Sequence, residues 1–214
     1  MSVPCKIMEH IIFHEMISAL DSNQVLVYYK YGFRKKLSCE TQSICTVEEI
    51  PRFLDKGEET DLIIMDFSKD FDSVPSQPLP LKLCYYGIRG FLNTWLTQWL
   101  TCRSQSVVVE GYNSPDVPVL SGVPQGTVLG PLLFLLYITD LGENCTSRMY
   151  LFADDTLIYS TIKSYNDAAK LQSDLTALQE WAQKWQMKFN LSKCHILRIS
   201  RKQNPVESNY VLMR

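Results

Sequence analysis

Two aspartates, Asp154 and Asp155, stand side by side within the otherwise apolar run YLFADDTLIYS at 150–160. A buried carboxylate without a partner is costly, so such groups normally become neutral, pair with a cation or coordinate a metal ion. The alternative is the tip of a hairpin, where both side chains simply face water. The pair alone leaves these two interpretations open.

A third aspartate, Asp66, ends another apolar run in IIMDFSKDFDSV. Two adjacent strands would bring Asp66 and Asp154 together although they lie far apart in the sequence. Three carboxylates at one edge of a sheet repel one another unless divalent cations lie between them. Mg²⁺ prefers oxygen ligands, and two such ions promote in-line displacement at phosphorus in polymerases. The spacing predicts a site for two Mg²⁺ ions, for which Mn²⁺ can substitute, without naming the reaction.

The elements that position these residues are a mixture of helices and strands. Apolar residues at helical spacing predict helices at 6–20, from Phe91 and after Ser164, which together with Asp167 offers a cap. Short apolar or β-branched runs predict strands from Asp61, at 105–113 and at 194–200, a hairpin around the acidic pair, and a buried helix at 128–138. This order predicts an α/β (α+β) fold.

Composition narrows the class of protein. The 214 residues are 46% hydrophobic and 21% charged, as in one large or two small globular domains. No apolar run reaches 18 residues and the N-terminus does not resemble a signal peptide, so we expect no membrane partner and no secretion. The seven cysteines lack a Cys-x-x-Cys pair, which favours reduced thiols in the cytoplasm or nucleus. A net charge of -2 requires any nucleic-acid contact to come from local basic patches.

Three blocks follow one another along the chain: IIMDFSKDFDSVP, LSGVPQGTVLGPLLFLLYITDL and FADDTLIY. In this order and approximate spacing they resemble the reverse transcriptases of non-LTR (LINE-like) retrotransposons. The flanking PCKIMEHII, YGFRKKLSCETQ and WQMKFNLSKC are similar to further blocks of that family, so the resemblance covers roughly residues 4–200. A lone acidic pair is a weak signal, whereas the three blocks in order are specific.

The resemblance implies roles for several residues. Asp66, Asp154 and Asp155 match the catalytic metal-binding aspartates of a palm hairpin, with Asp155 less directly committed to metal. Phe71 matches the bulky residue beneath the nucleotide sugar, where it would exclude a ribose 2′-hydroxyl. The alternative for Phe71 is an ordinary core residue after a strand.

Three further matches concern the nucleotide. SGVPQG matches the loop that contacts the incoming nucleotide and the template, with Gln125 as a hydrogen-bonding group and Gly126, like Gly122, allowing close backbone approach. Arg34 resembles the fingers arginine that grips the triphosphate, and Lys193 matches a lysine that could protonate the leaving pyrophosphate. The alternatives are a plain helix-entry loop, a solvated basic face and an ordinary turn lysine.

Some residues depart from the family pattern. Asp70 stands where a small alanine is usual, Ser76 replaces a usual histidine, and Pro78 and Pro80 are expected to break a normally helical stretch. These departures leave open a catalytically inactive or truncated remnant that at most binds nucleic acid. An unrelated metal-dependent phosphohydrolase is a third interpretation, but it would not need SGVPQG.

The expected architecture is a polymerase palm sheet with packed helices plus partial fingers, and without a thumb. We expect the partial fingers at 1–58, the palm with interspersed fingers segments at 59–200 and an irregular tail at 201–214. The implied activity is RNA-directed DNA polymerisation, in which a DNA primer on an RNA template is extended with deoxynucleoside triphosphates (dNTPs). The family's thumb and endonuclease would have to come from outside this chain, and the expected location is intracellular.

Overall fold

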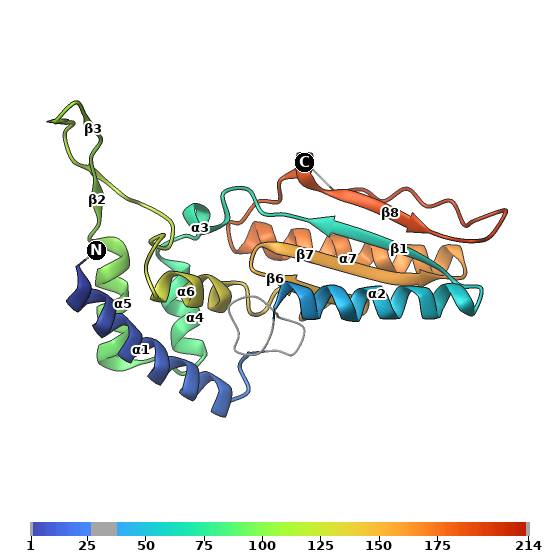
Figure 1. The fold of residues 1–214 in the computed structure, drawn as a ribbon, viewed down its shortest axis with the longest axis horizontal. Coiled ribbons are helices and arrows are strands. Elements are labelled where there is room, and N and C mark those ends of the chain that lie inside the picture. Colours follow the sequence, from blue (N-terminus) through green and yellow to red (C-terminus); the bar gives the residue numbers. More distant parts are fainter. Residues whose placement is uncertain (1, 27–37, 213–214) are drawn as a thin grey trace. The chain divides into compact units, whose positions relative to one another are not determined.

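The computed structural model describes residues 2–26 and 38–212 (Figure 1). The chain divides into two compact units. The helical unit contains residues 1–26 and 69–139, and the sheet unit contains residues 27–68 and 140–214. Each unit is described by itself.

The sheet unit is built on four antiparallel strands in the order β6-β7-β1-β8. Their bounds are Glu59–Met65 for β1, Arg148–Phe152 for β6, Asp155–Ile162 for β7 and His195–Ile199 for β8. The inner strand β1 is buried along nearly its whole length, including the polar residues Glu59, Thr60 and Asp61 at its start. The strand predicted from Asp61, the acidic hairpin and the strand at 194–200 are confirmed.

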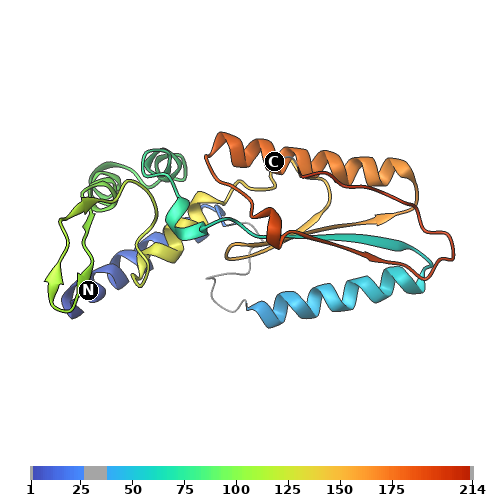
Figure 2. The same ribbon diagram turned by 90° about the horizontal axis from the view of Figure 1, so that it is seen from above.

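Two helices cover the sheet, and Figure 2 shows them on opposite faces. They are α2, Cys39–Asp55, and α7, Tyr165–Lys184. The predicted cap of α7 is confirmed, because Ser164 and Asp167 form a capping box. On the other face, Glu49 of α2 accepts a hydrogen bond from Tyr159 and pairs with Arg148 at 2.5 Å, which joins α2 to the β6–β7 hairpin.

The segment after β8 has no regular secondary structure as far as residue 212, yet polar contacts fasten it to the sheet and to α7. The buried Asp61 accepts hydrogen bonds from Ser208 at 2.7 Å and Tyr210 at 2.6 Å. Gln172 of α7 exchanges two hydrogen bonds with the backbone of Val211. These hydrogen bonds hold residues 208–211 against β1 and α7.

In the helical unit, α6, Leu129–Tyr137, is buried at nearly every position. The other helices are α1, Val3–Ser22, α3, Asp70–Ser73, α4, Pro78–Tyr85, and α5, Gly90–Thr101. The helices predicted at 6–20, from Phe91 and at 128–138 are confirmed. The apolar face expected for α5 is only partly buried, because Leu96 and Leu100 are enclosed whereas Phe91 is exposed.

Short strands form a projecting hairpin between α5 and α6. β2, Ser104–Gln105, pairs with β5, Val117–Pro118, and β3, Val108–Val109, pairs with β4, Tyr112–Asn113. The strand predicted at 105–113 is thus interrupted, and its glycine turn at Gly111 has a φ of +84°.

The prediction that Pro78 and Pro80 break a helix is wrong. Both lie in the first turn of α4, which begins at Pro78. Backbone N–H groups in a first turn have no acceptor within the helix, so proline loses no hydrogen bond there. The two prolines set where α4 starts and do not interrupt it.

Candidate active site

The register of the sheet places Asp66 between the two other candidate segments. Met65, the last residue of β1, lies opposite Thr156 of β7, so one further step brings Asp66 level with Asp155. On the other side of β1, the pairing with β8 ends where Ile64 lies opposite His195. Before β8 the chain forms a short helical turn that carries Lys193, and Asn190 at its start donates a backbone hydrogen bond to the carbonyl oxygen of Asp66. The ends of three strands therefore meet at Asp66.

The acidic pair sits at a tight turn. Phe152 and Asp155 are the last paired residues of β6 and β7, so Ala153 and Asp154 form a two-residue turn. Ala153 has a φ of +54°, a conformation that L-residues rarely adopt. Strained backbone of this kind clusters at functional sites. This arrangement answers the question raised by the sequence: the pair forms a hairpin tip and also joins a carboxylate cluster.

The three carboxylates lie close together. One oxygen from each of Asp66, Asp154 and Asp155 lies within 4.8 Å of the others. Asp66 is buried, and its side chain is only 12% exposed. Burial, together with the negative charges of Asp154 and Asp66, raises the pKa of Asp155 above its ordinary value. The cluster therefore concentrates negative charge at one place.

Lys193 reaches this cluster from the segment before β8. Its Nζ donates a hydrogen bond to Asp66 Oδ2 at 2.7 Å. That hydrogen bond and the charge of Asp66 raise the pKa of Lys193. Lys193 ends a short 3₁₀ helix, η1, Leu191–Lys193.

Asn190 holds that short helix in place, and nothing in the sequence analysis singled it out. Its backbone N–H donates to the carbonyl oxygen of Asp66 at 2.8 Å. Its side-chain oxygen caps η1 by accepting hydrogen bonds from the backbone N–H and the hydroxyl of Ser192. The sequence signal was present, because asparagine is a preferred N-cap residue, but its long-range bond to Asp66 required the fold.

The donor set fits a hard divalent cation. Carboxylate oxygens are the ligands that Mg²⁺ and Mn²⁺ prefer. Asp66 Oδ1 is buried and accepts no hydrogen bond from the residues that the structure describes, which is expensive for a carboxylate that has no other partner. A cation held between the three carboxylates would satisfy that oxygen and relieve the repulsion.

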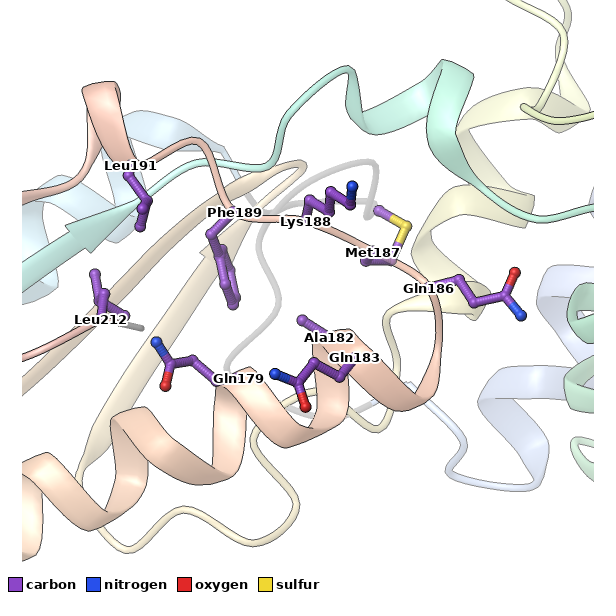
Figure 3. Close-up of a pocket in the computed structure, with 9 residues that line it drawn as sticks. All are labelled: Gln179, Ala182, Gln183, Gln186, Met187, Lys188, Phe189, Leu191 and Leu212. Atoms are coloured by element: carbon purple, nitrogen blue, oxygen red, sulfur yellow. The ribbon is translucent and has the colours of Figure 1, made fainter. Parts of the chain in front are cut away.

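A pocket of about 580 Å³ lies beside the segment that precedes Lys193 in the sequence (Figure 3). The end of α7, the segment 186–191 and Leu212 line it. Phe189 points into the pocket and its ring stacks on Phe67, the residue after Asp66, with 4.6 Å between ring centroids. This aromatic pair therefore packs the residue that follows Asp66 against the segment that leads to Lys193.

The candidate nucleotide-contacting residues meet in the helical unit. Phe71 in α3 is half-buried and stacks on Phe134 of α6, with 4.8 Å between ring centroids. The carbonyl oxygen of Phe71 accepts a hydrogen bond from Val123 in SGVPQG at 2.8 Å. Gln125 is exposed and its amide donates to Asp72 at 3.2 Å. The structure thus brings Phe71 together with the SGVPQG loop, while Arg34 lies outside the described residues.

Two charged residues bind the backbone in this loop and at the start of α6 after it, and the sequence analysis missed both. The buried Glu9 of α1 accepts hydrogen bonds from the backbone N–H groups of Val128 and Leu129, so it caps α6 from another helix. Arg103 donates to the carbonyl oxygen of Gly122 at 2.6 Å. Neither has a local sequence signal, because each partner lies many residues away.

Gly122 is predicted to be irreplaceable for steric reasons. Its φ is +89°, and a Cβ would lie 2.9 Å from the Cα of Asp72. We expect Gly122→Ala to lower the free energy of unfolding by at least about 2 kcal/mol, since it combines a left-handed backbone with a clash against main chain. Urea denaturation measures this loss.

Gly126 supplies the matched control. Its φ is +73°, but a Cβ there would meet no atom within 4 Å among the described residues. Gly126→Ala should therefore cost only the conformational part, about 1 kcal/mol. Equal losses for the two variants would show that close packing against Asp72 does not matter.

Comparison with known proteins decides the family. The family described as reverse transcriptase (RNA-dependent DNA polymerase) matches residues 1–208. The chain belongs to the reverse transcriptase family. Within it, the chain is 28% identical over 205 residues to the RNA-directed DNA polymerase from the mobile element jockey of Drosophila melanogaster. The jockey polymerase of Drosophila funebris is 27% identical over 202 residues. Each match covers 88% of this chain, which spans about a fifth (22%) of either relative's length.

Solved telomerase structures share the fold. Apo telomerase from Candida tropicalis, truncated from its C-terminal domain, matches with a TM-score of 0.67 and 11% identity over 91% of this chain and 41% of that one. Candida albicans telomerase, solved with a fragment of telomeric RNA, matches with a TM-score of 0.61 and 12% identity. This match covers 90% of this chain and 36% of the telomerase chain. The predicted family and the mixed helix and strand fold with a palm sheet are confirmed. No helix in the described part of the chain is long and apolar enough to cross a bilayer.

Proposed function

We propose that this reverse transcriptase-family chain carries the catalytic core of an RNA-directed DNA polymerase. The observation that carries the proposal is the convergence of Asp66, Asp154 and Asp155 at the ends of paired strands, with oxygens within 4.8 Å. These residues would hold two Mg²⁺ ions, with Mn²⁺ as a substitute, between them. The bound ions would supply activation of the primer 3′-hydroxyl and stabilisation of the leaving oxygen.

Other side chains would bind the nucleotide, select its sugar and protonate the leaving group. Phe71 would lie beneath the sugar of the incoming dNTP and exclude a 2′-hydroxyl. Gln125 and Gly126 would contact the nucleotide and the template, and Arg34 would bind the triphosphate. Lys193 would donate a proton to the departing pyrophosphate. The exposed position of Gln125 supports its assignment, because a solvent-facing amide is accessible to a ligand.

The partners in this proposal are an RNA template, a DNA primer and dNTPs, and the site of action is intracellular. The division into fingers at 1–58 and palm at 59–200 stays a prediction. The reverse transcriptase family and the palm fold support the choice of an RNA template.

Primer extension on an RNA template tests the proposal directly. Purified protein is incubated with an annealed DNA primer, the four dNTPs and MgCl₂, and the products are resolved by length. We expect template-dependent extension that stops when EDTA is added. Protein that is folded by circular dichroism, yet neither extends a primer nor binds divalent metal, would instead favour the inactive remnant. Cleavage of phosphodiesters without a primer would favour the phosphohydrolase.

A further inference from the structure

Lys193 occupies a position at the carboxylate cluster that its role as a proton donor does not require. Its Nζ lies 2.7 Å from Asp66 Oδ2, in direct contact with the most buried of the three aspartates. A proton donor to pyrophosphate has to reach the triphosphate, whereas this contact directs the ammonium group toward the expected metal ligands. Proton donation to pyrophosphate therefore does not account for the contact between Lys193 and Asp66.

The backbone of Lys193 is fixed, but its side chain is not enclosed. Asn190 anchors the segment through its bond to the Asp66 carbonyl and through its cap on η1. The Lys193 side chain is 60% exposed, in contrast to 12% for Asp66. Because a long, exposed lysine side chain rotates easily, its ammonium group can leave Asp66 while the backbone stays in place.

The charges explain why the ammonium group lies there. Three carboxylates with oxygens within 4.8 Å repel one another, and one positive charge at Asp66 offsets part of that repulsion. The oxygen that Lys193 contacts, Oδ2, belongs to the same carboxylate as Oδ1, which a divalent cation would satisfy. An ammonium group on Oδ2 neutralises part of the charge of that carboxylate and repels a cation at Oδ1, so lysine and metal compete for Asp66.

We propose that Lys193 is the resident counter-ion of this site, which a divalent cation must displace from Asp66 and which thereby sets the metal concentration at which the site fills. The inference rests on the proposed function, since it takes the three aspartates to be the metal ligands. It adds that Lys193 has two positions: at Asp66 before metal binds, and released afterwards.

The competition has a measurable size. When a ligand must displace an internal partner, its apparent affinity is reduced in proportion to the fraction of molecules in which that partner has already left. If the lysine is released, Lys193→Met should tighten Mn²⁺ binding about tenfold, which corresponds to about 1.4 kcal/mol. Lys193→Arg keeps the charge and the donor, so its affinity should stay close to that of the parent.

Lys188 provides the matched control. It lies on the same segment and is exposed, and it is one of the residues that line the pocket in Figure 3. Lys188→Met removes the same charge without removing a partner of Asp66. It therefore measures the general effect of one lost positive charge, which we expect to change Mn²⁺ affinity less than about twofold because salt screens exposed charges.

The experiment measures Mn²⁺ binding by isothermal titration calorimetry on the full chain, together with melting temperatures in EDTA and in MgCl₂. In EDTA, we expect Lys193→Met to have a lower melting temperature than the parent, because the repulsion between the carboxylates is no longer offset. With metal, we expect it to bind Mn²⁺ about tenfold more tightly than the parent and to show a larger rise in melting temperature than the parent does. Mn²⁺ binding no tighter than that of Lys188→Met would overturn the inference. A parent chain that binds no Mn²⁺, or binds it equally well after Asp154→Asn, would instead refute the proposed metal site.

Discussion

Asp66→Asn and Asp154→Asn should each lower primer extension at least about a thousandfold. A metal ion that polarises phosphoryl oxygen contributes several kcal/mol to transition-state stabilisation, and about 4 kcal/mol corresponds to a thousandfold in rate. Asparagine keeps the shape of the side chain but removes the charge that would hold the cation. Single-turnover extension with saturating dNTP measures the loss in the chemical step.

The two variants should differ in stability, which separates catalysis from folding. Asp154→Asn removes one member of a repelling cluster, so the metal-free protein should be at least as stable as the parent. Asp66→Asn also removes the charged partner of Lys193, so its free energy of unfolding should rise less than that of Asp154→Asn. Glu180→Gln, on an exposed position of α7, serves as the control and should retain activity. Full activity in either aspartate variant would exclude a role in metal binding.

The positions of these carboxylates could be anticipated because their signals are local. The apolar runs before Asp66 and around the acidic pair identify strands, and two strands that end in aspartate predict a shared edge of a sheet. The capping box at Ser164 is likewise contained in four residues. Family resemblance then supplied the reaction, which strand patterns alone do not contain.

Other features depend on contacts that no local pattern contains. The cap on α6 comes from Glu9, more than a hundred residues earlier, and the bond from Asn190 to Asp66 joins segments on either side of the hairpin. The error at Pro78 has a different cause. Proline breaks a helix interior but begins a helix readily, so the outcome depends on where the helix starts, and element boundaries are what sequence patterns determine least well.

Sugar discrimination should collapse when Phe71 is made smaller. If its ring lies beneath the sugar, Phe71→Val would open space for a 2′-hydroxyl and reduce the preference for dNTPs over ribonucleotides about a hundredfold. That factor corresponds to the loss of a clash of about 3 kcal/mol. The measurement is the ratio of kcat/KM for dNTP and ribonucleotide incorporation on one RNA template.

The stacking of Phe71 on Phe134 gives the competing explanation a distinct signature. A purely structural Phe71 would lose packing on substitution and lower the free energy of unfolding by about 1–3 kcal/mol, while the sugar ratio of the active fraction would not move. Phe71→Tyr keeps the ring and its bulk, so it should retain discrimination. Because a ratio of two substrates on one preparation cancels the fraction of folded protein, an unchanged ratio in active Phe71→Val would return Phe71 to the role of a core residue.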